Sequence, residues 1–142
     1  MSKGNTFEND LLKLIFNATA IANLADNAAS SPLTNLYVAL HTADPGEAGA
    51  QNTSECSYTS YARVAVARTA GAWSVVNNVV SPVAEIAFPE ATAGSQTATH
   101  FSIGTAVSGA GKILYKGAIS PTIAIAAGVS PRLKTTSTIT ED

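Results

Sequence analysis

Charged residues, cysteine and long apolar runs are all scarce in this 142-residue chain. Only 13% of the residues are charged, about half the usual share for a soluble domain, whereas 46% are hydrophobic. This composition excludes a disordered, solvating chain. A surface with so few charges either becomes partly buried in an assembly or belongs to a sandwich rich in small residues, and composition alone does not choose between the two.

Three further absences narrow the function classes. Cys56 is the only cysteine, so no disulfide can form within the chain, which favours assembly in a reducing cytoplasm. The basic residues are scattered and the net charge is −2, so no nucleic-acid surface is predicted. No apolar stretch reaches membrane-spanning length and no secretion signal is recognisable, so no membrane association is expected.

An amphipathic helix is predicted over residues 5–26, with Asn5 as its N-cap and Glu8 as the reciprocal partner of that cap. One apolar stripe on this helix is expected to face the core, and it consists of Phe7, Leu11, Leu14, Ile15, Ala18, Ile21, Ala22 and Ala25. Leu12 and Phe16 point away from the stripe, so they are predicted to contact another protein. The alternative is that the β part of the chain wraps around the helix and buries both side chains.

From residue 33 to residue 140 the chain consists of short β-prone runs separated by Gly, Pro, Asn and Ser. The expected strands are residues 36–42, 61–67, 73–76, 79–88, 97–105, 112–119, 122–126 and 130–140. Asn77-Asn78 and residues 108–111 suit tight hairpin turns, because Asn and Gly tolerate positive φ. The pattern therefore predicts a mainly β fold: a jelly-roll-like antiparallel sandwich of about eight strands with one N-terminal amphipathic helix, forming a single domain over residues 1–142.

The longest irregular segment covers residues 43–57 and lacks apolar periodicity. Loops of this length in compact domains usually have a use. Asp44, Glu47, Asn52 and Glu55 are therefore predicted to reach a neighbouring protein, and a mobile surface loop is the open alternative.

No residue is predicted to be catalytic, to ligate a metal or to bind a cofactor. His41 and His100 lack partners at zinc-site spacing, and each is expected to be hydrogen-bonded near a sheet edge. No serine stands in a Gly-x-Ser-x-Gly context. The glycine-rich run before Lys112 fails the phosphate-loop pattern, because Ile113 stands where Ser or Thr is required. The chain is expected to be non-enzymatic.

A pattern of five segments extends over most of the chain: Leu36–Gly46, Tyr61–Val64, Phe88-Pro89, Thr99–Gly104 and Gly111–Gly117. Together these segments resemble a family of small virion proteins from tailed bacteriophages that often carries a tail-fibre-like label. Proteins of this size and type resemble jelly-roll cement proteins, which sit outside a capsid lattice and commonly form dimers. The resemblance therefore implies a capsid cement or decoration protein on the outer capsid surface, assembled in the host cytoplasm, with the major capsid protein and a second copy of itself as partners.

Two other functions remain open. A tail, collar or fibre-associated adaptor would share the β architecture but occur in a few copies at one vertex, so copy number separates it from a cement protein. A host-glycan binding module is the third candidate, because Trp73 and the four tyrosines could stack on sugars. A buried anchor is the more common role for a lone Trp in a sandwich.

Overall fold

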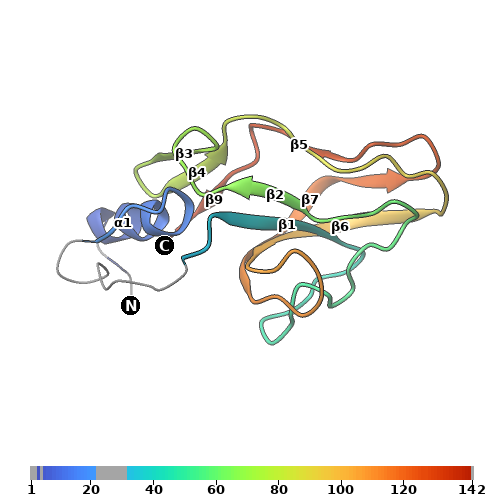
Figure 1. Cartoon of the computed structure of the whole chain (residues 1–142), viewed down its shortest axis with the longest axis horizontal. Helices are drawn as coiled ribbons and strands as arrows, with labels where there is room; N and C mark the ends of the chain where they lie inside the picture. Colours follow the sequence, from blue (N-terminus) through green and yellow to red (C-terminus); the bar gives the residue numbers. More distant parts are fainter. Residues whose placement is uncertain (1–2, 4, 22–31, 142) are drawn as a thin grey trace. The chain divides into compact units, whose positions relative to one another are not determined.

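The computed structural model describes residue 3, residues 5–21 and residues 32–141 of the chain. The fold is mainly β, with antiparallel sheets and one helix near the N-terminus, as predicted (Figure 1). The elements are α1 (Asn5–Phe16), β1 (Asn35–His41), β2 (Val64–Ala67), β3 (Trp73–Val76), β4 (Val79–Pro82), β5 (Ile86–Ala87), β6 (Gln96–Gly104), β7 (Ile113–Ile125), β8 (Arg132–Leu133) and β9 (Ile139–Thr140). The predicted runs 79–88 and 130–140 each divide into two short strands, whereas runs 112–119 and 122–126 join in β7.

The chain forms two compact units, each assembled from segments that are distant in the sequence. Unit 1 contains Met1–Thr34, Ala67–Ile86 and Leu133–Asp142, and unit 2 contains Asn35–Val66 and Ala87–Arg132. The strands form a sheet in the order β3-β4-β9, a sheet in the order β2-β1-β6-β7, and a two-stranded pair of β5 with β8. The sequence predicted one domain over residues 1–142, and that assignment stays a prediction.

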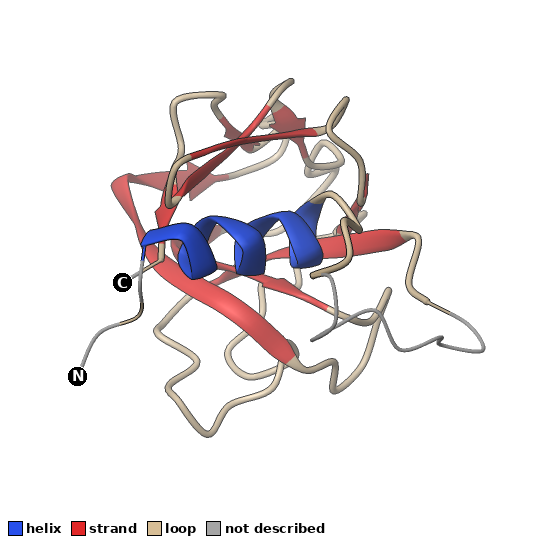
Figure 2. Cartoon of the chain, turned by 90° about the vertical axis from the view of Figure 1, so that its left-hand side faces the viewer, coloured by secondary structure: helices blue, strands red, loops and turns tan. Residues whose placement is uncertain are grey.

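In unit 1, α1, the blue helix in Figure 2, packs on β3 and β4, and the face that it buries differs from the predicted one. Its buried residues are Glu8, Leu12 and Phe16, one turn apart, whereas Phe7 from the predicted core stripe is 40% exposed. The ring of Phe16 meets that of Trp73 edge to face, with centroids 4.9 Å apart. The prediction that Leu12 and Phe16 are exposed contact residues is therefore wrong, because the large Trp73 ring selects the side of the helix that carries them.

The helix ends at Phe16, ten residues before the predicted boundary at residue 26, and residues 22–26 lie outside the described part of the chain. Ala18 adopts a left-handed backbone with φ of 53°, which stops the helical hydrogen bonding. The guanidinium of Arg68 then donates to the carbonyls of Leu14 and Ile15, at 2.7 Å and 2.6 Å. A cation at the helix C-terminus satisfies orphan carbonyls and opposes the negative end of the helix dipole.

One predicted hairpin turn is confirmed and the other belongs to a longer loop. Asn77-Asn78 joins β3 to β4 with Val76 opposite Val79, and Asn77 has a φ of 56°, as a tight hairpin requires. Residues 108–111 lie inside the longer connection from β6 to β7 over residues 105–112, in which Gly109 has a φ of 72°. Because this connection is longer than a tight turn, unit 2 has a second long loop in addition to residues 43–57.

The sheet of unit 2 provides the support for these loops. Its inner strands, β1 and β6, pair antiparallel from Tyr37 opposite Gly104 to His41 opposite His100. Residues Val38 to His41 are all fully buried, so both faces of β1 are covered. The 43–57 loop follows the end of β1 directly, so its first residues leave from a rigid strand.

Candidate functional site

Two long loops of unit 2, residues 43–57 and 105–112, lie side by side and form a surface that we call the loop platform. Figure 1 shows them together, the first in teal and the second in orange. The backbone N–H of Gln51 donates to the carbonyl of Gly111 at 2.9 Å, which joins one loop to the other. The 43–57 segment is therefore an ordered part of the unit, held by its own sheet and by its neighbour.

Arg63, just before β2, ties the two loops together. Its Nε and Nη2 donate to the two carboxylate oxygens of Glu55 at 2.7 Å and 2.8 Å, a bidentate ion pair. Nη1 and Nη2 also donate to the carbonyls of Ala106 and Gly109, at 2.9 Å and 2.6 Å. The Arg63 side chain is 2% exposed, so this charge is neutralised inside the unit.

Tyr61 completes the cluster around Glu55. Its hydroxyl donates to Glu55 Oε1 at 2.9 Å and accepts the backbone N–H of Leu40 at 3.1 Å. Burial, helped by the nearby carboxylate, raises the pKa of the Tyr61 phenol far above its ordinary value, so it stays protonated and remains a donor. Glu55 was predicted to reach a neighbouring protein, but its carboxylate instead holds the platform from within.

Gln51 occupies the junction beneath the two loops and is fully buried. Its side-chain amide donates to the carbonyl of Tyr37 at 2.9 Å and accepts the N–H of Ala106 at 3.2 Å. Gly104 and Gly111 lie so close that a side chain on either would collide with the Gln51 amide. The glycines therefore leave room for one polar side chain that hydrogen-bonds to two backbone segments.

His41 fastens the 43–57 loop to the sheet. Its Nδ1 lies 2.9 Å from the carbonyl oxygen of Thr53, and its Nε2 lies 2.8 Å from Ser102 Oγ on β6. His100 is also hydrogen-bonded, since its Nδ1 lies 2.9 Å from Thr99 Oγ1. Both histidines are hydrogen-bonded as predicted, but they lie on inner strands and not at a sheet edge.

The buried serine–histidine pair and the cysteine have the wrong surroundings for nucleophilic chemistry. Ser102 and His41 are both fully buried, so Ser102 Oγ has no access to a substrate in this conformation. His41 Nδ1 faces a backbone carbonyl and not a carboxylate. Burial raises the pKa of Cys56 to about 11, which keeps its thiol protonated near neutral pH.

The exposed rim of the platform carries two of the predicted contact residues. Asp44 and Glu47 have side chains that are 51% and 95% exposed, and each places a carboxylate oxygen 3.1 Å from Lys116 Nζ on β7. The pKa of Asp44 is lowered mainly by the hydrogen bond from the Gly46 N–H and secondly by the hydrogen bond from Lys116. Hydrogen bonds to Asp44 and Glu47 raise the pKa of Lys116. Asp44 and Lys116 are therefore both charged over the neutral range.

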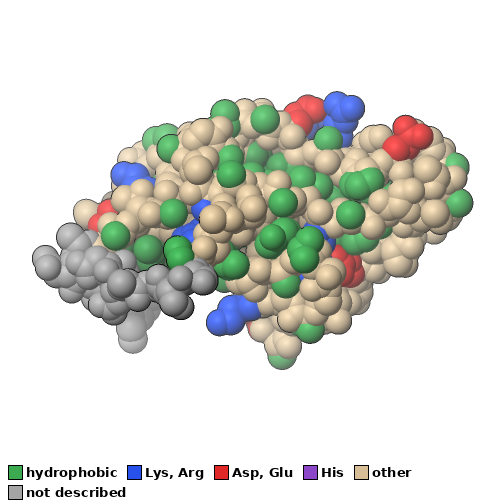
Figure 3. Space-filling model, in the orientation of Figure 1, with side chains coloured by type: hydrophobic (Ala, Val, Ile, Leu, Met, Phe, Trp, Pro, Cys, Tyr) green, Lys and Arg blue, Asp and Glu red, His purple; other side chains and the backbone are tan. Residues whose placement is uncertain are grey.

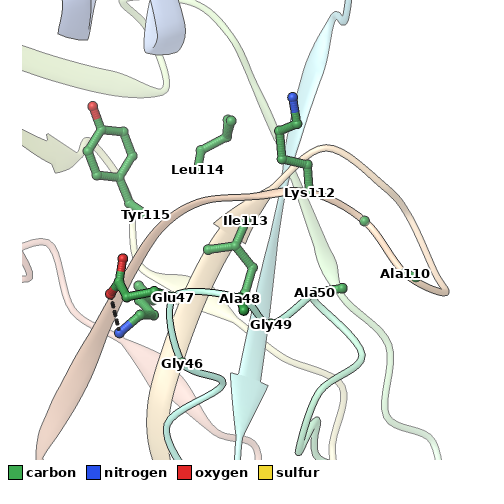
Figure 4. Close-up of a pocket in the computed structure, with 12 residues that line it drawn as sticks. Gly46, Glu47, Ala48, Gly49, Ala50, Ala110, Lys112, Ile113, Leu114 and Tyr115 are labelled. Atoms are coloured by element: carbon green, nitrogen blue, oxygen red, sulfur yellow. Dashed lines mark ion pairs between the residues drawn. The ribbon is translucent and has the colours of Figure 1, made fainter.

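A pocket of about 520 Å³ adjoins this rim, between Gly46–Ala50 and Ala110–Lys116 (Figure 4). In Figure 4 a dashed line at Glu47 marks its ion pair with Lys116, and the Ile113 side chain points toward Ala48 of the loop. Most of the loop residues that line the pocket are glycine or alanine, so small side chains and backbone leave the hollow. Asn52, a third predicted contact residue, is also exposed on the 43–57 loop.

The structure thus divides the predicted contact residues into three groups. Asp44, Glu47 and Asn52 share the exposed platform, Glu55 lies within it, and Leu12 and Phe16 are buried in unit 1. Sequence reasoning missed the internal supports Arg63 and Gln51 and the rim residue Lys116. No local pattern could reveal them, because their partners are 8 to 72 residues away in the sequence.

Charged side chains are few on the face of the molecule shown in Figure 3, as the low charged content implies. Within residues 3, 5–21 and 32–141, no three His, Cys, Asp or Glu side chains gather as metal ligands would. In the same part of the chain, no helix is both long and apolar enough to cross a membrane.

Comparison with known protein families gives a match over nearly the whole chain. The model of a protein family described as podophage GP4 fiber I protein gp80 matches residues 2–140, nearly the whole chain. A search among curated proteins finds no match.

Proposed function

Since this chain belongs to the podophage GP4 fiber I protein gp80 family and is a bacteriophage virion structural protein, we propose that it serves in a tail fibre or fibre-associated part of the particle. The family match over residues 2–140 is the observation that carries this proposal, because the family description names a fibre protein. A capsid cement role, with the major capsid protein as partner, stays a prediction that the same experiment tests.

The loop platform is the surface that we propose for contact with a neighbouring virion protein. Arg63, Glu55 and Gln51 fix its shape from below, so little conformational entropy is lost when a partner binds. Asp44, Glu47 and Lys116 give its rim charges of both signs beside a hollow lined by small residues. Charges of both signs on a contact surface select a partner with a complementary charge pattern. A structural role of this kind needs no catalytic residue, and we propose that the chain is not an enzyme.

Copy number and location in purified virions test the proposed role. Quantitative mass spectrometry with antibody labelling should find a few copies confined to the tail. Many copies spread over the head would instead support the cement role and would contradict the fibre assignment. Mass measurement of the purified chain, compared with the monomer mass of 14.4 kDa, tests the predicted self-association separately.

Charge reversal on the platform tests the contact surface. The Glu47→Lys variant should reduce the amount of this protein in virions, because it places a second cation beside Lys116 and reverses the rim charge. Glu90→Lys is the matched control, since Glu90 is also an exposed acid of unit 2 but lies outside the platform. Equal loss of both variants, or loss of neither, would remove the platform from the proposal.

A further inference from the structure

The imidazole of His41 lies between the 43–57 loop and strand β6 and is hydrogen-bonded through both ring nitrogens. Its partners are the carbonyl of Thr53, at 2.9 Å, and Ser102 Oγ, at 2.8 Å. The backbone extends this attachment, because Cys56 donates to Leu40 and Thr42 donates to Ser54, each at 2.8 Å. The loop therefore meets the sheet at a short, buried contact centred on His41.

The two partners define which ring nitrogen carries the proton. A backbone carbonyl only accepts, so Nδ1 donates to Thr53, and Nε2 must then accept the hydroxyl proton of Ser102. A second proton on the ring would occupy Nε2 and force the Ser102 hydroxyl to turn its hydrogen elsewhere. Ser102 is fully buried, so its hydroxyl cannot donate to water instead, and losing its acceptor destabilises the protonated state.

The charges around His41 offer little compensation for an imidazolium. The hydrogen bond to the Thr53 carbonyl favours the charged ring, as does the charge of Glu55, whereas Arg63 and His100 oppose it. The Glu55 carboxylate already accepts hydrogen bonds from Arg63 and Tyr61. Burial is the largest influence and lowers the pKa of His41 below its ordinary value of 6.5.

We propose that His41 makes the loop platform responsive to pH, holding residues 43–57 on the sheet while the ring is neutral and loosening them when it is protonated. The attached loop favours the neutral ring, so its stabilisation is complete above the ordinary pKa of about 6.5 and is lost as the pH falls below that value. As a regulator of partner binding, this pH response rests on the proposed function of the loop platform. The loosening itself is a property of the isolated chain and can be measured without a partner.

Hydrogen exchange of the full chain tests this directly, read by mass spectrometry between about pH 7.5 and about pH 5, the range in which histidine titrates. After correction for intrinsic exchange rates, the hydrogen-bonded amides of Gln51, Thr53 and Cys56 should exchange at least several-fold faster at the acidic end. Amides of the β3–β4 hairpin in unit 1 should show no such change.

Two matched variants identify the group responsible. In His41→Gln the side-chain amide can still donate to Thr53 and accept from Ser102 but cannot ionise, so the acid-induced exchange should disappear. In His100→Gln the other histidine is removed, and the wild-type response should remain. If His41→Gln does not fold, the His41 ring signals of the wild-type chain in NMR must titrate together with the exchange of Thr53 and Cys56.

An exchange pattern of residues 43–57 that is independent of pH would overturn the proposal, as would an acid response that persists in His41→Gln. These results stand apart from the proposed function. Virion occupancy of the Glu47→Lys variant reports whether the platform binds a partner, whereas exchange in the isolated chain reports whether His41 controls the platform.

Discussion

Replacing Arg63 with methionine removes the guanidinium that joins Glu55 to the 105–112 loop while keeping much of the apolar stem. The Arg63 side chain is 2% exposed and the Glu55 side chain 15% exposed, so the variant leaves a carboxylate largely buried without its cation. The carbonyls of Ala106 and Gly109 lose their donor as well. Breaking a buried ion pair lowers the free energy of unfolding by about 3–5 kcal/mol. Because Glu55 is partly exposed, we expect a loss near the lower end of this range for Arg63→Met.

Urea unfolding followed by circular dichroism measures this loss, provided that the slope of the transition is unchanged. A second variant, Glu55→Gln combined with Arg63→Met, should recover about 1 kcal/mol, because no unpaired carboxylate then remains. Lys112→Met is the control for losing an exposed cation in the same unit, with an expected change within about 0.5 kcal/mol. A cost below about 1 kcal/mol for Arg63→Met would refute the idea that this ion pair holds the platform.

Two further pairs of substitutions test unit 1. Phe16→Ala should lower the free energy of unfolding by about 3–5 kcal/mol, because it removes the ring packed on Trp73, whereas Phe7→Ala, on the exposed face, should change it by less than about 0.5 kcal/mol. Equal effects in urea titrations of the two variants would contradict the observed orientation of α1. Asn77→Ala should cost about 1 kcal/mol, because alanine tolerates the φ of 56° poorly, and Asn77→Gly should be nearly neutral. Thermal unfolding of both Asn77 variants checks this, and an unchanged midpoint for Asn77→Ala would count against a strained turn.

The helix shows where sequence reasoning about a surface failed. Apolar residues occur around most of α1, so the wheel offered two faces, and the broader stripe with Phe7 was expected to be the buried one. The structure buries Leu12 and Phe16 instead, because Phe16 meets Trp73, a residue 57 positions later. Apolar helix residues indicate an interface only when the face that packs on the rest of the chain has been identified correctly.

The loop platform shows that the local sequence does not distinguish an ordered loop from a mobile one. Length and composition alone marked residues 43–57 as a segment with a use, and three of its four predicted contact residues are exposed there. The fourth, Glu55, is polar like the other three in the sequence, but in the fold its carboxylate is paired with Arg63. A mobile loop and an ordered platform have the same local pattern, since the difference comes from hydrogen bonds with Gln51, Arg63 and His41 made across the unit.

The sequence by itself determined the mainly β class, most strand positions, the Asn77-Asn78 turn, the start of the helix and the phage virion family, because periodicity, turn residues and a family pattern are written in neighbouring residues. Only the tertiary structure decided which helix face is buried, where α1 ends, how the strands join and what supports the loops. Each of these depends on a partner far along the chain, such as Trp73 for Phe16, Arg68 for the end of α1 and Arg63 for Glu55. A local pattern limits what a residue can do, and the long-range contact selects which of those possibilities occurs.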